Sequence, residues 1–448
     1  MSVFTRMEPV IGIRCLHLDL KGQPPTPQRL LSLLELLAKA RYNAVLVEWE
    51  DMFPWTCDER FRCETAYKPE EVKAFVAKAK ELGIDIIPLV QCLGHLETPL
   101  KFPEYAHLRE VPDRPDVLNP LAEGARDLVM RMVDDVLALM PDIKYLHLGG
   151  DEAWTFGTHP DTKAYIEAHG KGALYMHHVE PILDHLLAQG IRPILWHDMM
   201  THWDDASLDH LKGKADLCVW GYQGSPKTVA STRHFHISHI QRFAEHGVSL
   251  WGGTAYKGAD GLDAEVPNPE IRAFNIKAWT DTATEYNMKG VVATAWSRYN
   301  TMVTQCEPID ASLDMLVLAG IVMYNGEQPE NVQDAIATVL QEAGELERFR
   351  ACYEPVAELG RLKKIAWDQV RLARIADACF KLDPDRADPQ AMQRRISDLN
   401  RLVKRMEEQA KRIEESFTGL VPDVWIKRFC GDRIESLRGE IEDLAARI

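Results

Sequence analysis

Short apolar runs alternate with longer segments of helical periodicity along the first three quarters of the chain. Each run is short enough to predict a buried strand rather than a helix. The predicted strands are residues 11–18, 44–49, 84–90, 143–148, 192–196, 217–220, 248–251 and 291–295. The predicted helices that separate and follow them are residues 28–40, 69–82, 120–139, 173–189, 208–211, 236–246, 269–286 and 311–323. This succession of strand–helix units predicts the α/β class and a closed (β/α)8 TIM barrel.

From about residue 328 the pattern changes to long helices. Apolar residues follow spacings of three and four over residues 392–417, and another helix is predicted at residues 434–448. We therefore expect a barrel over residues 1–327 and a C-terminal α-helical extension over residues 328–448. The apolar stripe predicts a helical hairpin that packs either on its own barrel or on a second copy in a homodimer, and the sequence leaves both open.

The chain has 448 residues, of which 46% are hydrophobic and 27% charged, as in ordinary globular proteins. Its formal net charge of −16 argues against nucleic acid and anionic membranes as partners, but leaves neutral sugars open. No apolar run reaches the roughly 18 residues of a membrane span, and the first residues lack the apolar core of a signal peptide. Because the nine cysteines are scattered, we expect a reducing compartment and a cytoplasmic protein.

Residues 147–152 have the sequence His-Leu-Gly-Gly-Asp-Glu and close the fourth predicted strand. The carboxylates of Asp151 and Glu152 are adjacent, and no cation lies nearby in the sequence to pair with them. The two glycines would let a ligand approach the backbone closely, and Trp154 adds an aromatic ring. Because side chains alternate along a strand, His147 and Asp151 should face the barrel axis. Carboxylates, open backbone and an aromatic ring at a strand end indicate a site that grips and cleaves a sugar.

The other predicted strands also end in polar or aromatic residues. In a parallel barrel these strand ends meet on one face, where the chemistry belongs. The residues at the strand ends are Asp19, Glu50, Asp51, His95, Glu97, Asp151, Glu152, Trp196, Asp198, Trp220, Tyr222, Trp251, Tyr256, Trp296 and Arg298. Their joint occurrence predicts one site built from several loops.

At these positions the chain resembles glycoside hydrolase family 20, the β-N-acetylhexosaminidases. The pattern His-x-Gly-Gly-Asp-Glu at residues 147–152 matches the signature of that family at every fixed position. The resemblance covers residues 10–325, and residues 17–22 and 50–54 are similar to the hexosaminidase D-like branch, whose members are often intracellular. It implies an exo-acting enzyme that removes terminal β-linked N-acetylglucosamine or N-acetylgalactosamine from small glycans or glycosides, without a metal or cofactor.

The resemblance also implies retaining, substrate-assisted catalysis, in which the 2-acetamido oxygen of the substrate attacks the anomeric carbon and forms an oxazolinium intermediate. Glu152 would be the general acid and base, with a pKa raised by partial burial and by its neighbour. Asp151 would stay ionised, orient the acetamido N–H and balance the developing positive charge. A tyrosine should hold the acetamido oxygen. Tyr256 is the first choice because it occupies the strand position usual in the family, and Tyr222 is the rival.

The same resemblance suggests which residues bind the sugar. Strand-end tryptophans would form the pocket, Arg14 would bind hydroxyls as a forked donor, and histidines would link Glu152 to Asp51 or Glu50 in a relay. The predicted substrate-binding residues are Arg14, Asp19, His95, His147, Trp196, Trp220, Tyr222, Trp296, Arg298 and Glu307.

One position departs from the family. Many members carry Trp-x-Glu on the eighth strand, and the Glu binds the distal hydroxyls of the sugar, whereas this chain reads Trp296-Ser297-Arg298. We expect Glu307 to supply the missing carboxylate, with Arg298 or Asn300 beside it. The departure leaves the choice between gluco and galacto substrates open. The resemblance to the hexosaminidase D-like branch, which tolerates galactosaminides well, slightly favours galacto substrates.

Three other interpretations remain open on the sequence. The first is a metal-dependent barrel hydrolase, whose site would be assembled from histidines and aspartates. Those residues are His17, Asp19, His95, His147, His197 and Asp198. The second is a barrel that binds sugars without cleaving them, and the intact carboxylate pair argues against it. The third is a retaining glycosidase with an enzyme nucleophile, which would act on sugars that lack the 2-acetamido group.

Overall fold

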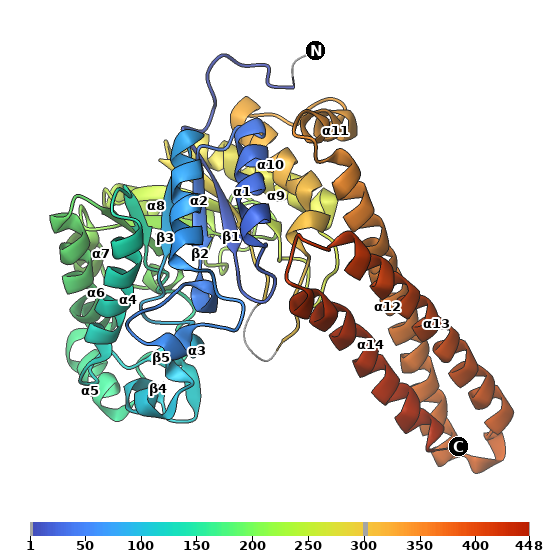
Figure 1. The fold of residues 1–448 in the computed structure, drawn as a ribbon. Helices are drawn as coiled ribbons and strands as arrows, with labels where there is room; N and C mark the ends of the chain where they lie inside the picture. Colours follow the sequence, from blue (N-terminus) through green and yellow to red (C-terminus); the bar gives the residue numbers. More distant parts are fainter. Residues whose placement is uncertain (1–2, 299–302, 448) are drawn as a thin grey trace.

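The computed structural model describes residues 3–298 and 303–447 of the chain. Its centre is a closed barrel of parallel strands in the order β1-β10-β9-β8-β7-β6-β3-β2 (Figure 1). The barrel strands are β1 (Ile13–Asp19), β2 (Ala44–Glu48), β3 (Asp85–Leu89), β6 (Tyr145–His147), β7 (Arg192–Trp196), β8 (Asp216–Trp220), β9 (Ser249–Lys257) and β10 (Gly290–Ala295). Each predicted strand overlaps one of these, so the (β/α)8 barrel is confirmed.

Helices surround the barrel and lie between its strands in the sequence (Figure 1). They are α1 (Pro27–Lys39), α2 (Pro69–Glu81), α3 (Glu97–Leu100), α4 (Ala125–Leu139), α5 (Pro160–His169), α6 (Lys171–Ala188), α7 (Asp205–Leu211), α8 (Ile237–Glu245), α9 (Pro269–Glu285), α10 (Leu313–Asn325) and α11 (Val332–Glu342). Short 3₁₀ helices occur at Glu50–Met52, Glu59–Phe61, Pro103–Leu108, Asp198–Met200, Ile309–Ala311 and Pro384–Arg386. Polar N-caps and a following proline define several helix starts, as at Thr26 before α1 and Asn268 before α9.

A small antiparallel sheet lies outside the barrel, in the connection from β3 to α4. It consists of β4 (Arg109–Val111) and β5 (Arg114–Leu118). The sequence did not predict this pair, because strands this short carry too few alternating positions to be recognised. The connection also contains α3 and forms part of the barrel mouth in Figure 1.

Side chains alternate along the barrel strands between the axis and the surrounding helices. Leu146 and Leu148 pack outward into the large core shared with the helices, as a period of two predicts. A separate cluster that includes Leu46, Trp196 and Trp251 packs along the axis. The barrel interior is therefore filled by side chains, and space for a ligand lies at its mouth.

Three long helices follow the barrel and form an arm that projects away from it (Figure 1). They are α12 (Leu346–Leu382), α13 (Pro389–Ser416) and α14 (Asp423–Ala445), and they share a hydrophobic core of their own. The stripe predicted on α13 is buried in that core. The predicted hairpin of α13 and α14 is present. The prediction lacked a third helix, because α12 packs along both helices and makes a three-helix bundle.

Buried cations attach the base of the arm to the barrel. Arg433 on α14 donates to Glu265 Oε1 at 2.6 Å and to the carbonyl oxygen of Gln305 at 2.8 Å. The Lys363 Nζ on α12 lies 2.6 Å from the same Glu265 Oε1 and 2.7 Å from Asp263 Oδ2. Asp263 and Glu265 belong to the connection from β9 to α9, and Gln305 follows β10. The arm therefore stands beside the carboxyl ends of the barrel strands.

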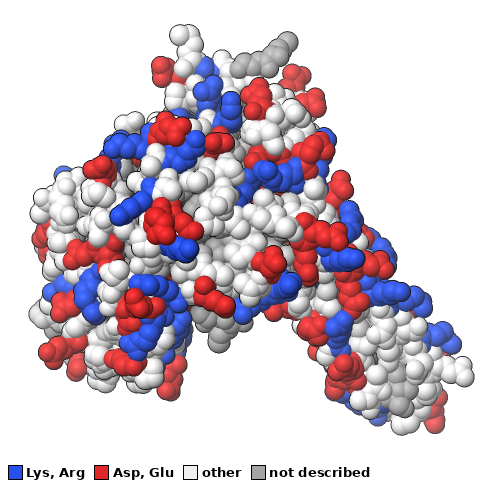
Figure 2. Space-filling model, in the orientation of Figure 1, with Lys and Arg blue, Asp and Glu red and all other residues white. Residues whose placement is uncertain are grey.

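Acidic and basic side chains are interspersed over both the barrel and the arm on the face drawn in Figure 2. On that face the acidic side chains are therefore not gathered in one patch. Among the helices of the described residues, none combines the length and the apolar character needed to span a bilayer.

Candidate active site

A cavity of about 130 Å³ opens at the carboxyl ends of the barrel strands. It is lined by Lys21, Glu48, His95, Asp151, Glu152, Trp220, Tyr222, Trp296 and Arg298. These side chains come from the ends of β1, β2, β3, β6, β8 and β10. The structure therefore brings seven of the predicted site residues together in one cavity and adds Lys21 and Glu48. The roles of the seven stay predictions.

The two glycines before the carboxylates are required by packing beneath the loop. Gly149 and Gly150 have φ angles of 58° and 78°, a region that favours glycine. A Cβ atom on Gly149 would lie 1.8 Å from Gln91 Oε1, and one on Gly150 would lie 2.1 Å from the hydroxyl oxygen of Tyr175. The neighbours of these glycines are therefore side chains of the protein, where the sequence suggested room for a ligand. The turn they allow is what aims Asp151 and Glu152 into the cavity.

The two carboxylates occupy different environments. Asp151 is buried, with 4% of its surface exposed, whereas the Glu152 side chain is 33% exposed. The His95 Nε2 lies 3.7 Å from Asp151 Oδ2 and 3.5 Å from Glu152 Oε2, so one imidazole contacts both groups. The backbone N–H of Glu152 donates to Asp198 Oδ2 at 3.0 Å, and its φ of 45° is unusual for a residue with a side chain. Glu152 is thus held by its backbone while its carboxyl faces the cavity.

Burial and neighbouring charges shift the pKa values of Asp151 and His95. Burial is the largest influence on the pKa of Asp151 and raises it well above its ordinary value, and Asp198 and Glu152 act in the same direction. Burial lowers the pKa of His95, but Asp151 and Glu152 outweigh burial and raise it to about 10. The His95 cation in turn opposes the upward shift at Asp151. Burial thus shifts Asp151 toward its protonated form and His95 opposes that shift, whereas the resemblance implies an ionised carboxylate.

Aromatic rings form one wall of the cavity. Trp220 and Tyr222 stack with ring centroids 5.2 Å apart, and Tyr222 lies 6.3 Å from Trp296. The Trp220 Nε1 donates to Asp198 Oδ1 at 3.2 Å, so the carboxylate that holds the Glu152 backbone also orients this indole. Burial raises the pKa of Tyr222 well above its ordinary value. Its hydroxyl therefore stays protonated at neutral pH and is available as a donor.

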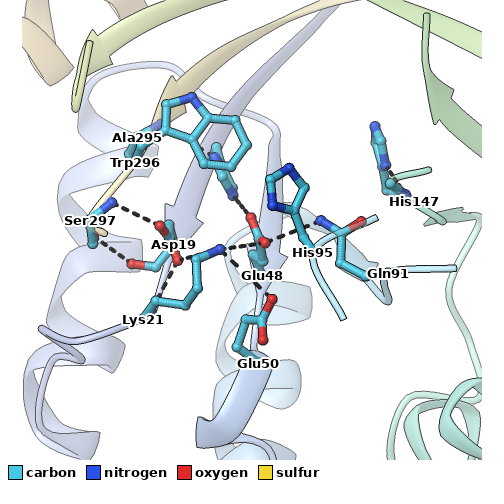
Figure 3. Close-up of polar contacts among 12 residues, drawn as sticks. Asp19, Lys21, Glu48, Glu50, Gln91, His95, His147, Ala295, Trp296 and Ser297 are labelled. Carbon is cyan, nitrogen blue, oxygen red and sulfur yellow. Dashed lines mark hydrogen bonds and ion pairs between the residues drawn. The ribbon is translucent and has the colours of Figure 1, made fainter. Parts of the chain in front are cut away.

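Charged groups of both signs form the wall at β1 and β2 (Figure 3). The Lys21 Nζ lies 2.5 Å from Glu48 Oε1, 3.3 Å from Asp19 Oδ1 and 3.9 Å from Glu50 Oε1. Asp19 does not line the cavity. Its Oδ2 accepts from the backbone N–H of Ser297 at 2.8 Å, which ties the end of β1 to the residues after β10. Asp19, predicted to bind the sugar, instead positions Lys21.

Tyr256, the first choice for holding the acetamido group, lies outside the cavity. The pairing of β9 with β10 shifts by one residue, from Ala255 to Lys257, and Tyr256 falls in that irregularity. Its ring is fully buried in the core between the barrel and its helices. Its hydroxyl has no hydrogen-bond partner among the described residues. Tyr256 is therefore corrected to a core residue, and Tyr222 is the tyrosine that faces the cavity.

Arg14 and Glu307 are also placed away from the cavity. Arg14 lies at the amino end of the barrel, where its Nε donates to the carbonyl oxygen of Arg41 and its Nη1 to that of Ile11, both at 2.7 Å. Glu307 is fully buried, and its Oε2 accepts from the backbone N–H of Gly258 at 2.9 Å. Both residues hold backbone segments, so neither can bind a hydroxyl of a sugar in this cavity.

Two further predicted binding residues lie beneath the cavity. Trp196 is fully buried on the barrel axis, with its ring 6.2 Å from that of Trp296. His147 packs 4.2 Å from Trp196, and its Nδ1 accepts from the backbone N–H of Gly149 at 2.9 Å. Burial lowers the pKa of His147 to about 3, so it is neutral. Figure 3 shows it apart from His95, which corrects the predicted relay: of the two histidines, His95 is the one that contacts Asp151 and Glu152.

Trp154 and Asn300 were also expected at or near the site. Trp154 is 73% exposed and does not line the cavity, so it is not part of the pocket that the motif suggested. Asn300, expected beside Glu307, lies outside the described residues. Glu307 therefore does not supply the missing carboxylate at the cavity, whereas Arg298 lines it and Glu48 reaches it from β2.

The groups considered for a metal site do not converge. The His17 Nε2 lies 3.3 Å from Glu48 Oε2, whereas the His197 Nε2 lies 2.9 Å from the carbonyl oxygen of His234 on the far side of the barrel mouth. Within the described ranges, no three His, Cys, Asp or Glu side chains come close enough together to hold a metal ion. The arrangement therefore supplies acid–base and hydrogen-bonding groups from the protein itself.

A parallel eight-stranded barrel whose mouth joins adjacent carboxylates to aromatic walls defines a glycoside hydrolase. The model of the catalytic domain of glycosyl hydrolase family 20 matches residues 50–308. The chain belongs to glycosyl hydrolase family 20, the β-N-acetylhexosaminidase family, whose members generally act on terminal N-acetylglucosamine or N-acetylgalactosamine. The resemblance found in the sequence is thereby confirmed.

The relatives agree with the predicted branch. Hexosaminidase D of Bos taurus is 31% identical over 342 residues, which cover 73% of this chain and 96% of that protein. Hexosaminidase D of Homo sapiens is 30% identical over 339 residues, which cover 73% of this chain and 69% of that protein. Among solved structures, chitobiase of Flavobacterium johnsoniae superimposes with a TM-score of 0.58 at 13% identity, over 98% of this chain and 73% of that one. The structural match supports the fold alone.

Proposed function

We propose that the protein is an exo-acting β-N-acetylhexosaminidase that removes terminal β-linked N-acetylglucosamine or N-acetylgalactosamine by retaining, substrate-assisted catalysis. One observation carries the proposal. Two adjacent carboxylates of unequal exposure, Asp151 and Glu152, face the same small cavity as Tyr222 and two tryptophans. Unequal environments let two neighbouring carboxyl groups take different roles on one sugar.

Glu152 acts as the general acid and then as the general base. It donates its proton to the glycosidic oxygen as the bond from that oxygen to C1 breaks, while the acetamido oxygen of the substrate forms a bond to C1. The ionised Glu152 next takes a proton from a water molecule whose oxygen attacks C1 and opens the oxazolinium ring. Two displacements at C1 return the β configuration. The partial exposure of Glu152 allows both the leaving group and water to reach it.

Asp151 holds the acetamido group from the other side. Its Oδ1 is buried and has no hydrogen-bond partner among the described residues, which fits an acceptor for the acetamido N–H. The positive charge that develops on the substrate adds to that of His95 and favours the ionised carboxylate, against the effect of burial. Asp151 thus stabilises charge that appears only as the reaction proceeds, which is the condition for acceleration.

Tyr222 takes the role predicted for Tyr256. Its protonated hydroxyl faces the cavity and donates to the acetamido oxygen, which orients that oxygen toward C1. Trp220 and Trp296 pack against the apolar faces of the sugar and the acetamido methyl group. Apart from the attacking water, the groups that act in this mechanism come from the chain and from the substrate.

The test is the hydrolysis of aryl β-glycosides of N-acetylglucosamine, N-acetylgalactosamine and glucose, each with and without a thiazoline mimic of the cyclised intermediate. We expect turnover of the two acetamido sugars only, blocked by the thiazoline. Turnover of the glucoside that resists the thiazoline would refute acetamido participation and would favour an enzyme nucleophile. A preparation from host cells without the expressed protein, purified in the same way, measures the background from contaminating glycosidases.

A further inference from the structure

Lys21 and Glu48 form a charged pair in the wall of the cavity that the mechanism above does not use. Both line the cavity, although Lys21 is only 13% exposed and Glu48 only 1%. An ammonium group has three N–H donors. One of them donates to Glu48 Oε1 at 2.5 Å, and Asp19 Oδ1 forms an ion pair at 3.3 Å that can occupy a second, whereas Glu50 at 3.9 Å is beyond hydrogen-bond distance. One N–H of Lys21 is therefore left for a group inside the cavity.

The order of strands around the barrel places Lys21 toward the side opposite the catalytic carboxylates, whereas Glu48 on β2 lies between the two sides. Asp151 and Glu152 follow β6, and the strand directly opposite β6 is β10, with β1 beside it. A sugar with C1 at Glu152 and its 2-acetamido group between Asp151 and Tyr222 extends its C4 away from β6. The substituent on C4 then lies toward the end of β1, which carries Lys21.

We propose that Lys21, together with Glu48, binds the hydroxyl on C4 of the sugar and thereby determines the choice between gluco and galacto substrates. This inference rests on the proposed function. A hydroxyl is both a donor and an acceptor. The Lys21 N–H meets its oxygen, and a Glu48 carboxylate oxygen accepts its hydrogen. Because N-acetylglucosamine and N-acetylgalactosamine differ in the orientation of this hydroxyl, a charged pair fixed at C4 discriminates between them.

The surroundings of the pair favour a role in binding over one in stability. A buried ion pair contributes little net stability compared with apolar side chains of the same volume. Here three carboxylates gather around a single lysine, and burial together with Glu48 raises the pKa of Glu50 to about 8. Packing alone does not require such a crowd of acids. A ligand that uses the remaining N–H and a carboxylate oxygen explains why both charges face the cavity.

Lys257 provides a matched control. It is fully buried near the same barrel mouth, and its Nζ donates to the carbonyl oxygen of Trp296 at 2.9 Å and to the Ser297 hydroxyl at 3.1 Å. It does not line the cavity. Loss of either lysine removes a buried cation beside the residues after β10, but only Lys21 can touch the sugar.

The experiment measures kcat/KM of wild type, Lys21→Met and Lys257→Met on aryl β-glycosides of both N-acetylhexosamines and on their 4-deoxy and 6-deoxy analogues. A hydrogen bond to a charged group corresponds to about 10- to 100-fold in kcat/KM. We expect Lys21→Met to lose about 10- to 100-fold in kcat/KM on the parent glycosides and on the 6-deoxy analogue. On the 4-deoxy analogue the loss should be less than about 3-fold. It should also bring the ratio of the gluco to the galacto rate closer to one. Lys257→Met should affect parent and 4-deoxy substrates equally.

The assignment would be overturned if Lys21→Met lost kcat/KM equally on the parent and the 4-deoxy substrates. It would also be overturned if the loss were smaller on the 6-deoxy analogue than on the parent. If Lys21→Met does not fold, Lys21→Arg keeps the charge and displaces the donor, and the same comparison applies to it. Calorimetric Kd values for the thiazoline and its 4-deoxy analogue are independent of turnover. They keep the assignment testable if the wild type cleaves neither N-acetylhexosaminide, a result that would refute the proposed function alone.

Discussion

Replacing each of two tyrosines with phenylalanine distinguishes the arrangement in the structure from the one expected from the sequence. Tyr222→Phe removes a hydroxyl that faces the cavity. We expect kcat to fall by about 100- to 1000-fold, as when one preorganised donor to a developing charge is lost. Tyr256→Phe removes a buried hydroxyl without a hydrogen-bond partner among the described residues. Burying such a group costs about 1–3 kcal/mol, and the small void left by the oxygen offsets part of this. The free energy of unfolding should therefore rise by about 1 kcal/mol, with kcat/KM unchanged within about 2-fold.

The assay measures kcat and KM separately on an aryl N-acetylglucosaminide and follows urea unfolding of both variants and the wild type. Circular dichroism of the native proteins controls for misfolding. A large loss of kcat in Tyr256→Phe, together with near wild-type kcat in Tyr222→Phe, would refute the assignment of Tyr222 and return the role to Tyr256. A stability loss in Tyr256→Phe would show that its hydroxyl has a partner in solution.

Further predictions concern the acid, its neighbour and the arm. Glu152→Gln should lower kcat on alkyl glycosides by about 10²–10⁴-fold while activated aryl substrates lose less, and equal losses on both contradict the acid role. His95→Gln removes the cation that opposes the raised pKa of Asp151, so the acid limb of the pH profile of kcat/KM should move to higher pH; an unmoved limb argues against this contact. In the homodimer that the sequence leaves open, the exposed Leu372 and Ile375 of α12 would be buried, and replacing both with Glu should lower the sedimentation coefficient toward that of a monomer. An unchanged coefficient excludes that surface.

The fold was predictable because each barrel strand is a short apolar run bounded by helical periodicity, a signal that survives errors of a residue or two at its ends. The long helix α12 was detectable in the same way. Its buried residues Cys352, Val356, Leu359, Ala366 and Val370 follow three/four spacing. Charged residues between these positions make the apolar spacing difficult to recognise in the sequence. The short β4 and β5 carry too few residues for any periodicity.

The site was predictable where residues directly follow a strand and not where the register had to be known. Arg14 and Asp19 lie five residues apart on β1, which is about 16 Å along a strand. Both therefore cannot lie at the same end of the barrel, and this was foreseeable. The irregular pairing that directs Tyr256 into the core depends on contacts between β9 and β10. The sequence around Tyr256 does not reveal it. Lys21 and Glu48 are 27 residues apart, and their pairing appears only when β1 and β2 lie side by side.

The two charged clusters of the cavity should respond differently to mutation, because His95 contacts Asp151 directly, whereas Lys21 contacts Glu48 and Asp19. His95 is the cation that faces Asp151 and Glu152, so its loss changes the charge felt by Asp151. Burial acts to raise the pKa of Glu48, and Lys21 is the largest influence that lowers it. His17, whose Nε2 lies 3.3 Å from Glu48 Oε2, lowers that pKa as well and stays in place when Lys21 is replaced. The pH profile of Lys21→Met should keep its acid limb in place while kcat/KM falls, in contrast to His95→Gln. A shift of that limb in Lys21→Met would mean that Lys21 acts on Asp151 through its charge and not on the sugar through a hydrogen bond.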